Sequence, residues 1–202
     1  MGIARTVATF VMASAALALA GCTGDNGDSE APAPTQTFAT PARVCPEELP
    51  PLPEGSTESW DLATDAPDLP KASAAWLCKY IQKDAGTAVN HPSDWVWSRD
   101  GEPKRLEGAG LDVVAGLLND LTVFPDGMVC TADLGPRWLV AFQVGDEVWG
   151  ATIDEYGCRW TRLTEDPFTV AAGHSDDPRL VQGSLRPPTG VLDDLKAAAG
   201  LA

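Results

Sequence analysis

The stretch RWLVAFQVGDEVWGATI, residues 137–153, alternates large apolar side chains with other residues on both sides of Gly145-Asp146. In a β-strand every second side chain lies on the same face, so a period of two indicates two strands. Two such runs joined by two turn-forming residues predict an antiparallel hairpin with one buried face. The side chains predicted to face the core are those of Trp138, Val140, Phe142, Val144, Trp149, Ala151 and Ile153.

The same alternation continues on both sides of this hairpin. Residues 128–134, MVCTADL, and residues 157–163, GCRWTRL, repeat the period of two. We therefore predict an antiparallel β-meander of about four strands, with a disulfide on its inner face. The inner face is predicted to carry Met128, Cys130, Ala132, Leu134, Cys158 and Trp160.

Two segments have helical spacing. Apolar residues recur at helical intervals over residues 109–121, with Asp112 in the first turn, which predicts the main helix. A last short helix is predicted over residues 191–199, with Thr189 as its candidate cap. The residues predicted to form the apolar stripe of the main helix are Leu111, Val114, Leu118 and Leu121.

Two further strands are predicted upstream. Residues 74–81, AAWLCKYI, fit a period of two or a helical period, and their aromatic and branched content favours a strand. Residues 95–97, WVW, predict a short strand, and Asp100-Gly101 predicts a hairpin-like turn after it. The complete pattern predicts an α+β fold in which one main helix packs on the antiparallel meander.

The N-terminus has the pattern of an export signal. Arg5 is the only charged side chain in residues 1–20, and the uncharged run from residue 6 to residue 20 is too short to span a bilayer. Leu19-Ala20-Gly21-Cys22 resembles the lipobox of bacterial lipoproteins. The resemblance implies that Cys22 becomes the first residue of the mature chain and carries a diacylglycerol. The alternative is an ordinary secretory signal cleaved after Ala18-Leu19-Ala20.

Composition divides the chain into three parts. Residues 1–21 form the predicted signal peptide, and residues 22–43, rich in Gly, Pro, Thr, Ser and acids, form a lipid anchor and disordered linker. Residues 44–202 hold all seven Trp and suit a single extracytoplasmic globular domain. Together with the lipobox, the small-residue-rich composition resembles that of small lipoproteins from GC-rich Gram-positive bacteria, which implies a location and no activity.

Four cysteines follow Cys22, and an even number in an exported chain predicts disulfides. Three pairings are conceivable. We favour Cys45–Cys78 and Cys130–Cys158, because each then closes its own segment in chain order, so that two disulfides staple the fold. Zinc is the competing interpretation, but the sequence has no CxxC pair and neither histidine lies near a cysteine.

The charge excludes one class of partner. The chain has a net charge of −15, and removal of the signal peptide and its one arginine leaves −16. Without a run of Lys or Arg, such a domain does not bind nucleic acid.

The candidate catalytic residues are few, and no motif for a cofactor is present. The sequence lacks G-x-S-x-G, and we interpret His91 and His174 as exposed loop histidines although Ser175 and Asp176 adjoin the second. The oxygen-rich stretches SDDP, from Ser175, and DLATDAPD, from residue 61, do not have the EF-hand spacing for calcium. Three acids at strand ends, which we interpret as solvated, are Asp133, Asp154 and Glu155.

Trp95 and Trp97 are the best binding candidates. They lie on one face of a predicted strand, where they can stack on sugar rings or clamp a partner, or else fill the core. Because no catalytic constellation is visible, we expect a non-catalytic, membrane-anchored envelope lipoprotein that binds a partner protein, a glycan or a small ligand. The alternative is an exported hydrolase that acts on cell-wall material through carboxylates.

Replacing Cys22 by Ala removes the thiol that would carry the lipid. Two acyl chains hold a protein stably on a membrane, whereas this acidic chain has no electrostatic attraction to anionic lipid. We expect cell fractionation to find the variant depleted from the membrane fraction. A variant retained there as fully as the wild type contradicts the anchor.

Overall fold

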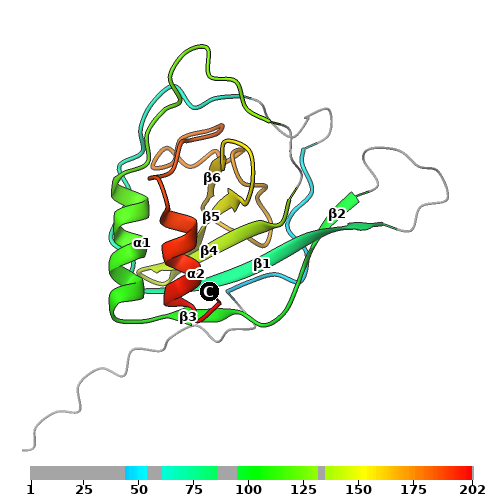
Figure 1. The fold of residues 1–202 in the computed structure, drawn as a ribbon, viewed down its shortest axis with the longest axis vertical. Coiled ribbons are helices and arrows are strands. Elements are labelled where there is room, and N and C mark those ends of the chain that lie inside the picture. The colour runs from blue at the N-terminus through cyan, green and yellow to red at the C-terminus, as the bar shows by residue number, and fades with distance from the viewer. Residues whose placement is uncertain (1–43, 54–60, 86–94, 132–134, 202) are drawn as a thin grey trace, which may run out of the picture. The chain divides into compact units, whose positions relative to one another are not determined.

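An antiparallel six-stranded sheet organises the residues that the computed structural model describes, namely 44–53, 61–85, 95–131 and 135–201. The strand order is β2-β1-β4-β5-β6, and β3 also pairs with β1 (Figure 1). Two helices accompany the sheet, which confirms the predicted α+β class. The elements are β1 Ala74–Asp84, β2 Trp95–Arg99, β3 Lys104–Leu106, α1 Ala109–Asn119, β4 Arg137–Val144, β5 Glu147–Asp154, β6 Thr161–Thr164 and α2 Val191–Ala198.

The hairpin predicted from the alternating run is confirmed. Val144 of β4 pairs with Glu147 of β5, so Gly145 and Asp146 form the two-residue turn. Gly145 has a φ of 60°, a left-handed conformation that residues with a side chain rarely adopt. Trp149, fully buried on the predicted face, shows that the alternation identified the core side of this hairpin.

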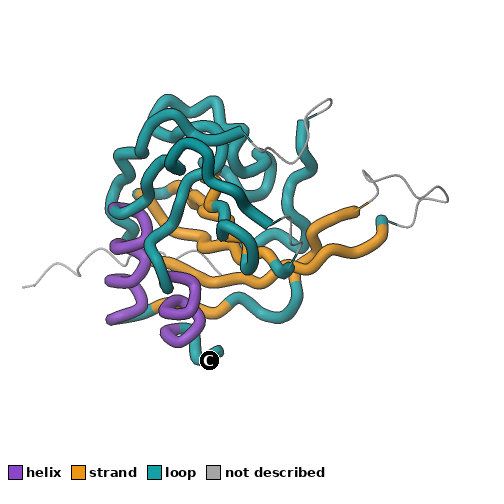
Figure 2. Tube along the Cα trace, turned by 45° about the horizontal axis from the view of Figure 1, so that its top comes forward, coloured by secondary structure: helices purple, strands orange, loops and turns teal. Residues whose placement is uncertain are grey.

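Both helices cover one face of the sheet, here called the helix face (Figure 2). The stripe predicted for α1 is buried from Val114 onward, whereas Leu111 is half-buried. The N-cap of α2 is Gly190, with a φ of 82° and no side-chain cap, so the prediction of Thr189 as the cap is wrong. The buried core on this face includes Leu77, Leu117, Val140, Phe142, Ala151, Ile153, Leu163, Leu192 and Leu195.

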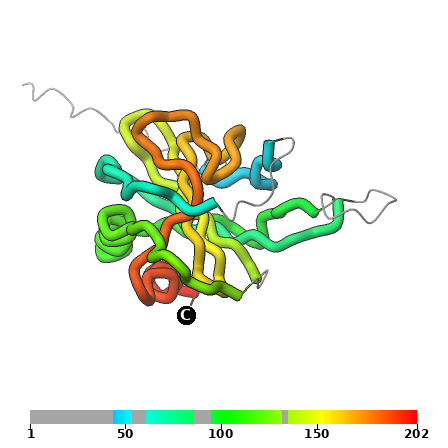
Figure 3. Tube along the Cα trace, turned by 90° about the horizontal axis from the view of Figure 1, so that it is seen from above, coloured from blue at the N-terminus to red at the C-terminus, as the bar shows by residue number. Residues whose placement is uncertain are grey.

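The opposite face, here called the strap face, is covered in part by residues 44–49, the N-terminal strap (Figure 3). Cys45 of the strap forms a disulfide with Cys78 of β1, as predicted, and each half-cystine is 1% exposed. The Tyr80 hydroxyl donates a hydrogen bond to the carbonyl of Pro46 at 2.7 Å. The amide of Leu49 donates to β2, so the strap also covers the outer edge of that strand.

The second predicted disulfide, Cys130–Cys158, is also present, but its surroundings differ from the prediction. Both of its cysteines are half-buried in loops, because β6 begins only at Thr161 and residues 128–131 form no strand. A first strand of the meander would pair with β4, yet β1 already pairs with that edge at seven positions. Met128, which was predicted to lie on the inner face, is 41% exposed, so this segment is not an inner-face strand; residues 132–134 lie outside the described residues.

Asp100-Gly101 is not a hairpin turn, which corrects a further prediction. Arg99 of β2 pairs with Tyr80 and Lys104 of β3 pairs with Leu77, so β2 and β3 run along the same edge of β1. The four residues between them lie opposite only two residues of β1, which makes a bulge. Asp100 binds Lys79 of β1 at 2.8 Å and fixes the bulge to that strand.

Differential reduction tests the unequal burial of the two disulfides. Their sequence separations, 33 and 28 residues, are similar, so the chain-entropy model assigns each about 3–4 kcal/mol. The two disulfides differ, however, in how accessible they are to a reductant, because Cys45–Cys78 is buried and Cys130–Cys158 is half-buried. We expect brief treatment with a mild reductant, followed by alkylation and peptide mapping, to label Cys130 and Cys158 before Cys45 and Cys78. Equal labelling of both pairs contradicts the buried strap.

Candidate functional site

Trp95 and Trp97 lie on the strap face but in different environments. Trp95 is 54% exposed at the start of β2. Trp97 is half-buried against the second core cluster, and the guanidinium carbon of Arg137 lies 4.3 Å from its ring centroid. The two rings therefore do not present one exposed stacking platform, and only Trp95 offers a mostly open face.

Asp154, predicted to be solvated, is held between two arginines. Its two carboxylate oxygens accept hydrogen bonds from Arg137 at 2.7 Å and Arg162 at 3.1 Å. The side chains of all three residues are at most 17% exposed. The prediction of solvation is wrong, because the strand register places these residues side by side on β4, β5 and β6.

Glu155 is bound in the same way on the other side of the sheet. It accepts hydrogen bonds from Lys196 of α2 at 2.7 Å and from the indole of Trp138 at 2.8 Å. Burial alone would raise the pKa of Glu155, but these two donors outweigh burial and hold the pKa below its usual value. Glu155 therefore ties α2 to the sheet, and the third candidate acid, Asp133, lies outside the described residues.

The loop around His174 does not assemble a nucleophile and a base. Ser175 is 2% exposed, and its hydroxyl oxygen accepts a hydrogen bond from the amide of Asp177 at 3.0 Å. His174 is half-buried rather than exposed, and its Nε2 is buried without a hydrogen-bond partner among the described residues. His91 lies outside the described residues.

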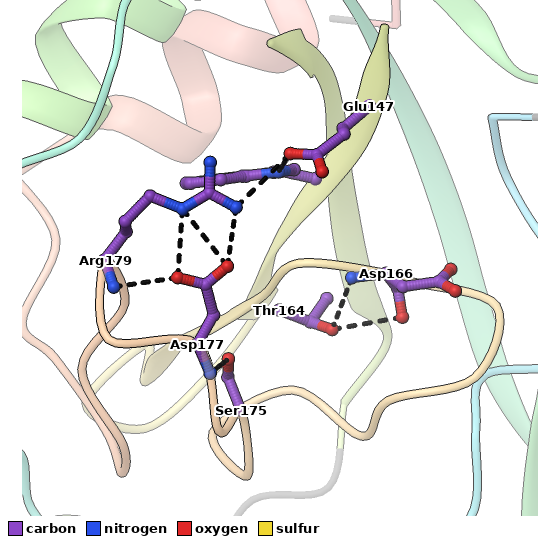
Figure 4. Close-up of polar contacts among 7 residues, drawn as sticks. Glu147, Thr164, Asp166, Ser175, Asp177 and Arg179 are labelled. Atoms are coloured by element: carbon purple, nitrogen blue, oxygen red, sulfur yellow. Dashed lines mark hydrogen bonds and ion pairs between the residues drawn. The ribbon is translucent and has the colours of Figure 1, made fainter.

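Arg179 pins this loop to β5 (Figure 4). Its guanidinium carbon lies 4.5 Å from the ring centroid of Trp149, and it binds Asp177 at 2.6 Å and Glu147 at 3.3 Å. The hydrogen bonds from Arg179 hold the pKa of Asp177 below its usual value. Figure 4 also draws the start of a second loop, where the Thr164 hydroxyl accepts a hydrogen bond from the amide of Asp166 at 3.2 Å and donates one to its carbonyl at 3.1 Å.

An open groove of about 550 Å³ lies beside the pinned loop. One wall comes from residues 61–65 and the other from residues 173–183. Backbone bonds join the two walls, since Leu62 bridges to Ser184 in parallel and the amide of Ser184 donates to the carbonyl of Asp61 at 2.9 Å. The lining residues are Asp61, Leu62, Thr64, Asp65, Gly173, His174, Pro178, Leu180, Val181, Gln182 and Gly183.

Two glycines with left-handed backbone conformations shape the groove, and one of them, Gly183, lies directly against the opposite wall. Gly183 has a φ of 86°, and a Cβ there would lie 2.8 Å from the carbonyl oxygen of Asp61. Gly173 has a φ of 88° and donates its amide to Leu163 of β6 at 2.8 Å. The groove therefore requires glycine at both positions, a signal that the sequence contains but that spacing alone does not distinguish from ordinary turn glycines.

The two oxygen-rich stretches considered for calcium contribute unequally to the groove, because DLATDAPD lines one wall with Asp61 and Asp65 whereas SDDP contributes only Pro178 to the other. In the part of the chain that the structure describes, no group of three or more His, Cys, Asp or Glu side chains is placed to hold a metal ion. Gln182 and Val181, which sequence reasoning missed, complete the second wall.

No protein-family model, curated protein or solved structure matches this chain. Among the described residues, no helix combines the length and the apolar character needed to cross a membrane. Cys22 lies outside the described residues.

Acid titration tests the role assigned to Glu155. Its lowered pKa means that its contribution to stability is present above the usual glutamate range, near pH 4.5, and is lost as the pH falls through the lowered value. We expect Glu155→Gln to reduce the free energy of unfolding at pH 7 by about 1–3 kcal/mol. We also expect a shallower loss of stability in the variant than in the wild type below pH 4.5, measured by urea unfolding. Parallel acid limbs contradict this role.

Proposed function

We propose that the chain is a lipid-anchored envelope protein that binds a ligand outside the cytoplasmic membrane, with the groove between residues 61–65 and 173–183 as its binding site. The Leu19-Ala20-Gly21-Cys22 sequence supports the anchor, because it resembles a lipobox. The groove supports binding, because its volume of about 550 Å³ falls in the range of small-molecule sites, about 300–1,000 Å³.

One observation carries the preference for binding over catalysis. Three of the side chains that sequence reasoning considered for chemistry are engaged in structural bonds: Asp154 with two arginines, Glu155 with Lys196, and Ser175 with the backbone. A general acid or nucleophile must instead reach a substrate. Because these side chains hold loops and strands in place, we do not assign them to the alternative, an exported hydrolase.

The junction between linker and domain also suits an anchored protein. The predicted linker, residues 22–43, has a root-mean-square span of about 25 Å as a flexible chain. It leads into Val44, which is fully buried, and then into Cys45, which is bonded to β1. A pull through the linker would therefore reach a central strand of the sheet through a covalent bond.

Substitution of Gly183, which lines the groove, tests the binding site. In Gly183→Ala the new Cβ meets backbone atoms of residues 61–63, and residue 183 keeps a left-handed conformation, so we expect the two walls to be forced apart, the groove to be distorted and about 1–2 kcal/mol of strain. The matched control is Gly116→Ala in α1, where a Cβ meets nothing within 4 Å and raises helix propensity.

Ligands are first sought by thermal shift of the wild type against a panel of envelope sugars, peptides and amines. We expect compounds that stabilise the wild type and Gly116→Ala to lose their effect on Gly183→Ala. Equal stabilisation of all three proteins places binding elsewhere.

A further inference from the structure

We propose that the chain carries a spontaneous modification site at Asp126-Gly127, where the aspartate converts to isoaspartate through a cyclic succinimide while the protein stays folded. This inference goes beyond the proposed ligand binding and does not depend on it, because neither residue lines the groove.

The sequence contains two Asp-Gly pairs, Asp100-Gly101 and Asp126-Gly127. Glycine favours the conversion, because it has no side chain to hinder the approach of its own amide nitrogen to the aspartate. Gly101 and Gly127 have left-handed φ angles of 93° and 73°, and a Cβ at either position would meet nothing within 4 Å. The glycines therefore do not distinguish the two pairs, and the difference lies in how the fold holds each aspartate.

Asp100 is restrained through both its side chain and its backbone. Its carboxylate binds the Lys79 ammonium at 2.8 Å, and its amide donates a hydrogen bond to the carbonyl of Lys79 at 2.8 Å. The hydrogen bond and the charge of Lys79 hold the pKa of Asp100 below its usual value. Because an aspartate closes the succinimide ring as the neutral acid, this ion pair keeps Asp100 in the unreactive form and directed at another strand.

Asp126 lies in an open turn. The turn is closed by a hydrogen bond from the amide of Met128 to the carbonyl of Pro125, at 3.4 Å, and residues 125–129 are all exposed. In the part of the chain that the structure describes, Asp126 makes no ion pair. Its carboxyl group therefore needs only local rotations to reach the amide nitrogen of Gly127.

The two ends of this segment are fixed, so a change in its middle stays local. Thr122 exchanges two backbone hydrogen bonds with Arg186, at 3.0 and 2.7 Å, and Cys130 is bonded to Cys158. The exposed residues between these two points can open and close again without exposing the core. The reaction at Asp126 therefore does not require the domain to unfold.

The conversion consumes no reagent other than water. The amide nitrogen of Gly127 attacks the side-chain carboxyl carbon of Asp126, a C–N bond forms, and the hydroxyl group leaves with the amide proton as water. Water then adds to the main-chain carbonyl of the ring and breaks its bond to the nitrogen of Gly127. The main chain now runs through the side chain of residue 126, with one additional methylene group. Addition of water at the other carbonyl restores aspartate, and nothing is oxidised or reduced.

Ageing of the oxidised full chain at neutral pH in water enriched in heavy oxygen, followed by peptide mapping, tests the proposal. Each ring opening adds one heavy oxygen, and fragmentation distinguishes isoaspartate from aspartate. We expect isoaspartate to form at Asp126 about fivefold faster or more than at Asp100, because Asp100 must first break its ion pair and its backbone hydrogen bond. Lys79→Gln removes that ion pair and should raise the rate at Asp100 about threefold, with the rate at Asp126 unchanged.

The matched control is the same chain after reduction and denaturation, where neither aspartate is restrained and the two rates should agree within about twofold. A ratio of rates that is the same in the folded and in the denatured chain overturns the proposal, because the fold would then make no distinction. A folded chain that forms no isoaspartate at Asp126 overturns it as well. Neither result affects the groove, whose ligand is sought separately with the thermal-shift panel.

Discussion

Strand β1 is the element on which both faces of the sheet depend. It pairs with β4 along one edge and with β2 and β3 along the other, so it joins the hairpin to the rest of the chain. Its side chains alternate between the two cores, with Leu77 on the helix face and Trp76 and Tyr80 on the strap face. Cys78 adds a covalent bond from this strand to the N-terminal strap. Loss of β1 would therefore expose both apolar faces and release the strap.

Local patterns predicted the hairpin and not the neighbour of β4. Phe142 and Trp149 belong to runs that alternate with a period of two, which predicts a buried face. Gly145 predicts the turn between them. The partner of β4 on its other edge, β1, lies more than fifty residues upstream, and nothing in the alternation of residues 128–134 shows that this edge is already occupied. Strand pairing over such a distance is decided by the total burial of both faces, which no single segment encodes.

The sequence predicted some residues of the candidate site but not how the fold brings them together. The acid-rich stretch from residue 61 stood out in the sequence, but its placement against residues 173–183 depends on backbone bonds through Ser184 and on the conformation of Gly183. The strand-end acids were misjudged for a related reason. Arg137 and Arg162 flank Asp154 only because three strands come into register, and sequence distance gives no hint of that pairing.

The two edges of the sheet contact different parts of the chain. The strap covers the outer edge of β2 and receives the linker, whereas the groove walls continue the sheet beyond β6, through the bridge between Thr161 and Leu185 and the bond from Gly173 to Leu163. Three strands lie between these two edges. Under the proposed anchoring, movement of the linker acts on β1 and β2 and leaves the backbone bonds of the groove undisturbed. In that proposal the groove at the β6 edge is separated from the point of attachment by the width of the sheet, so that a ligand from outside the membrane can reach it.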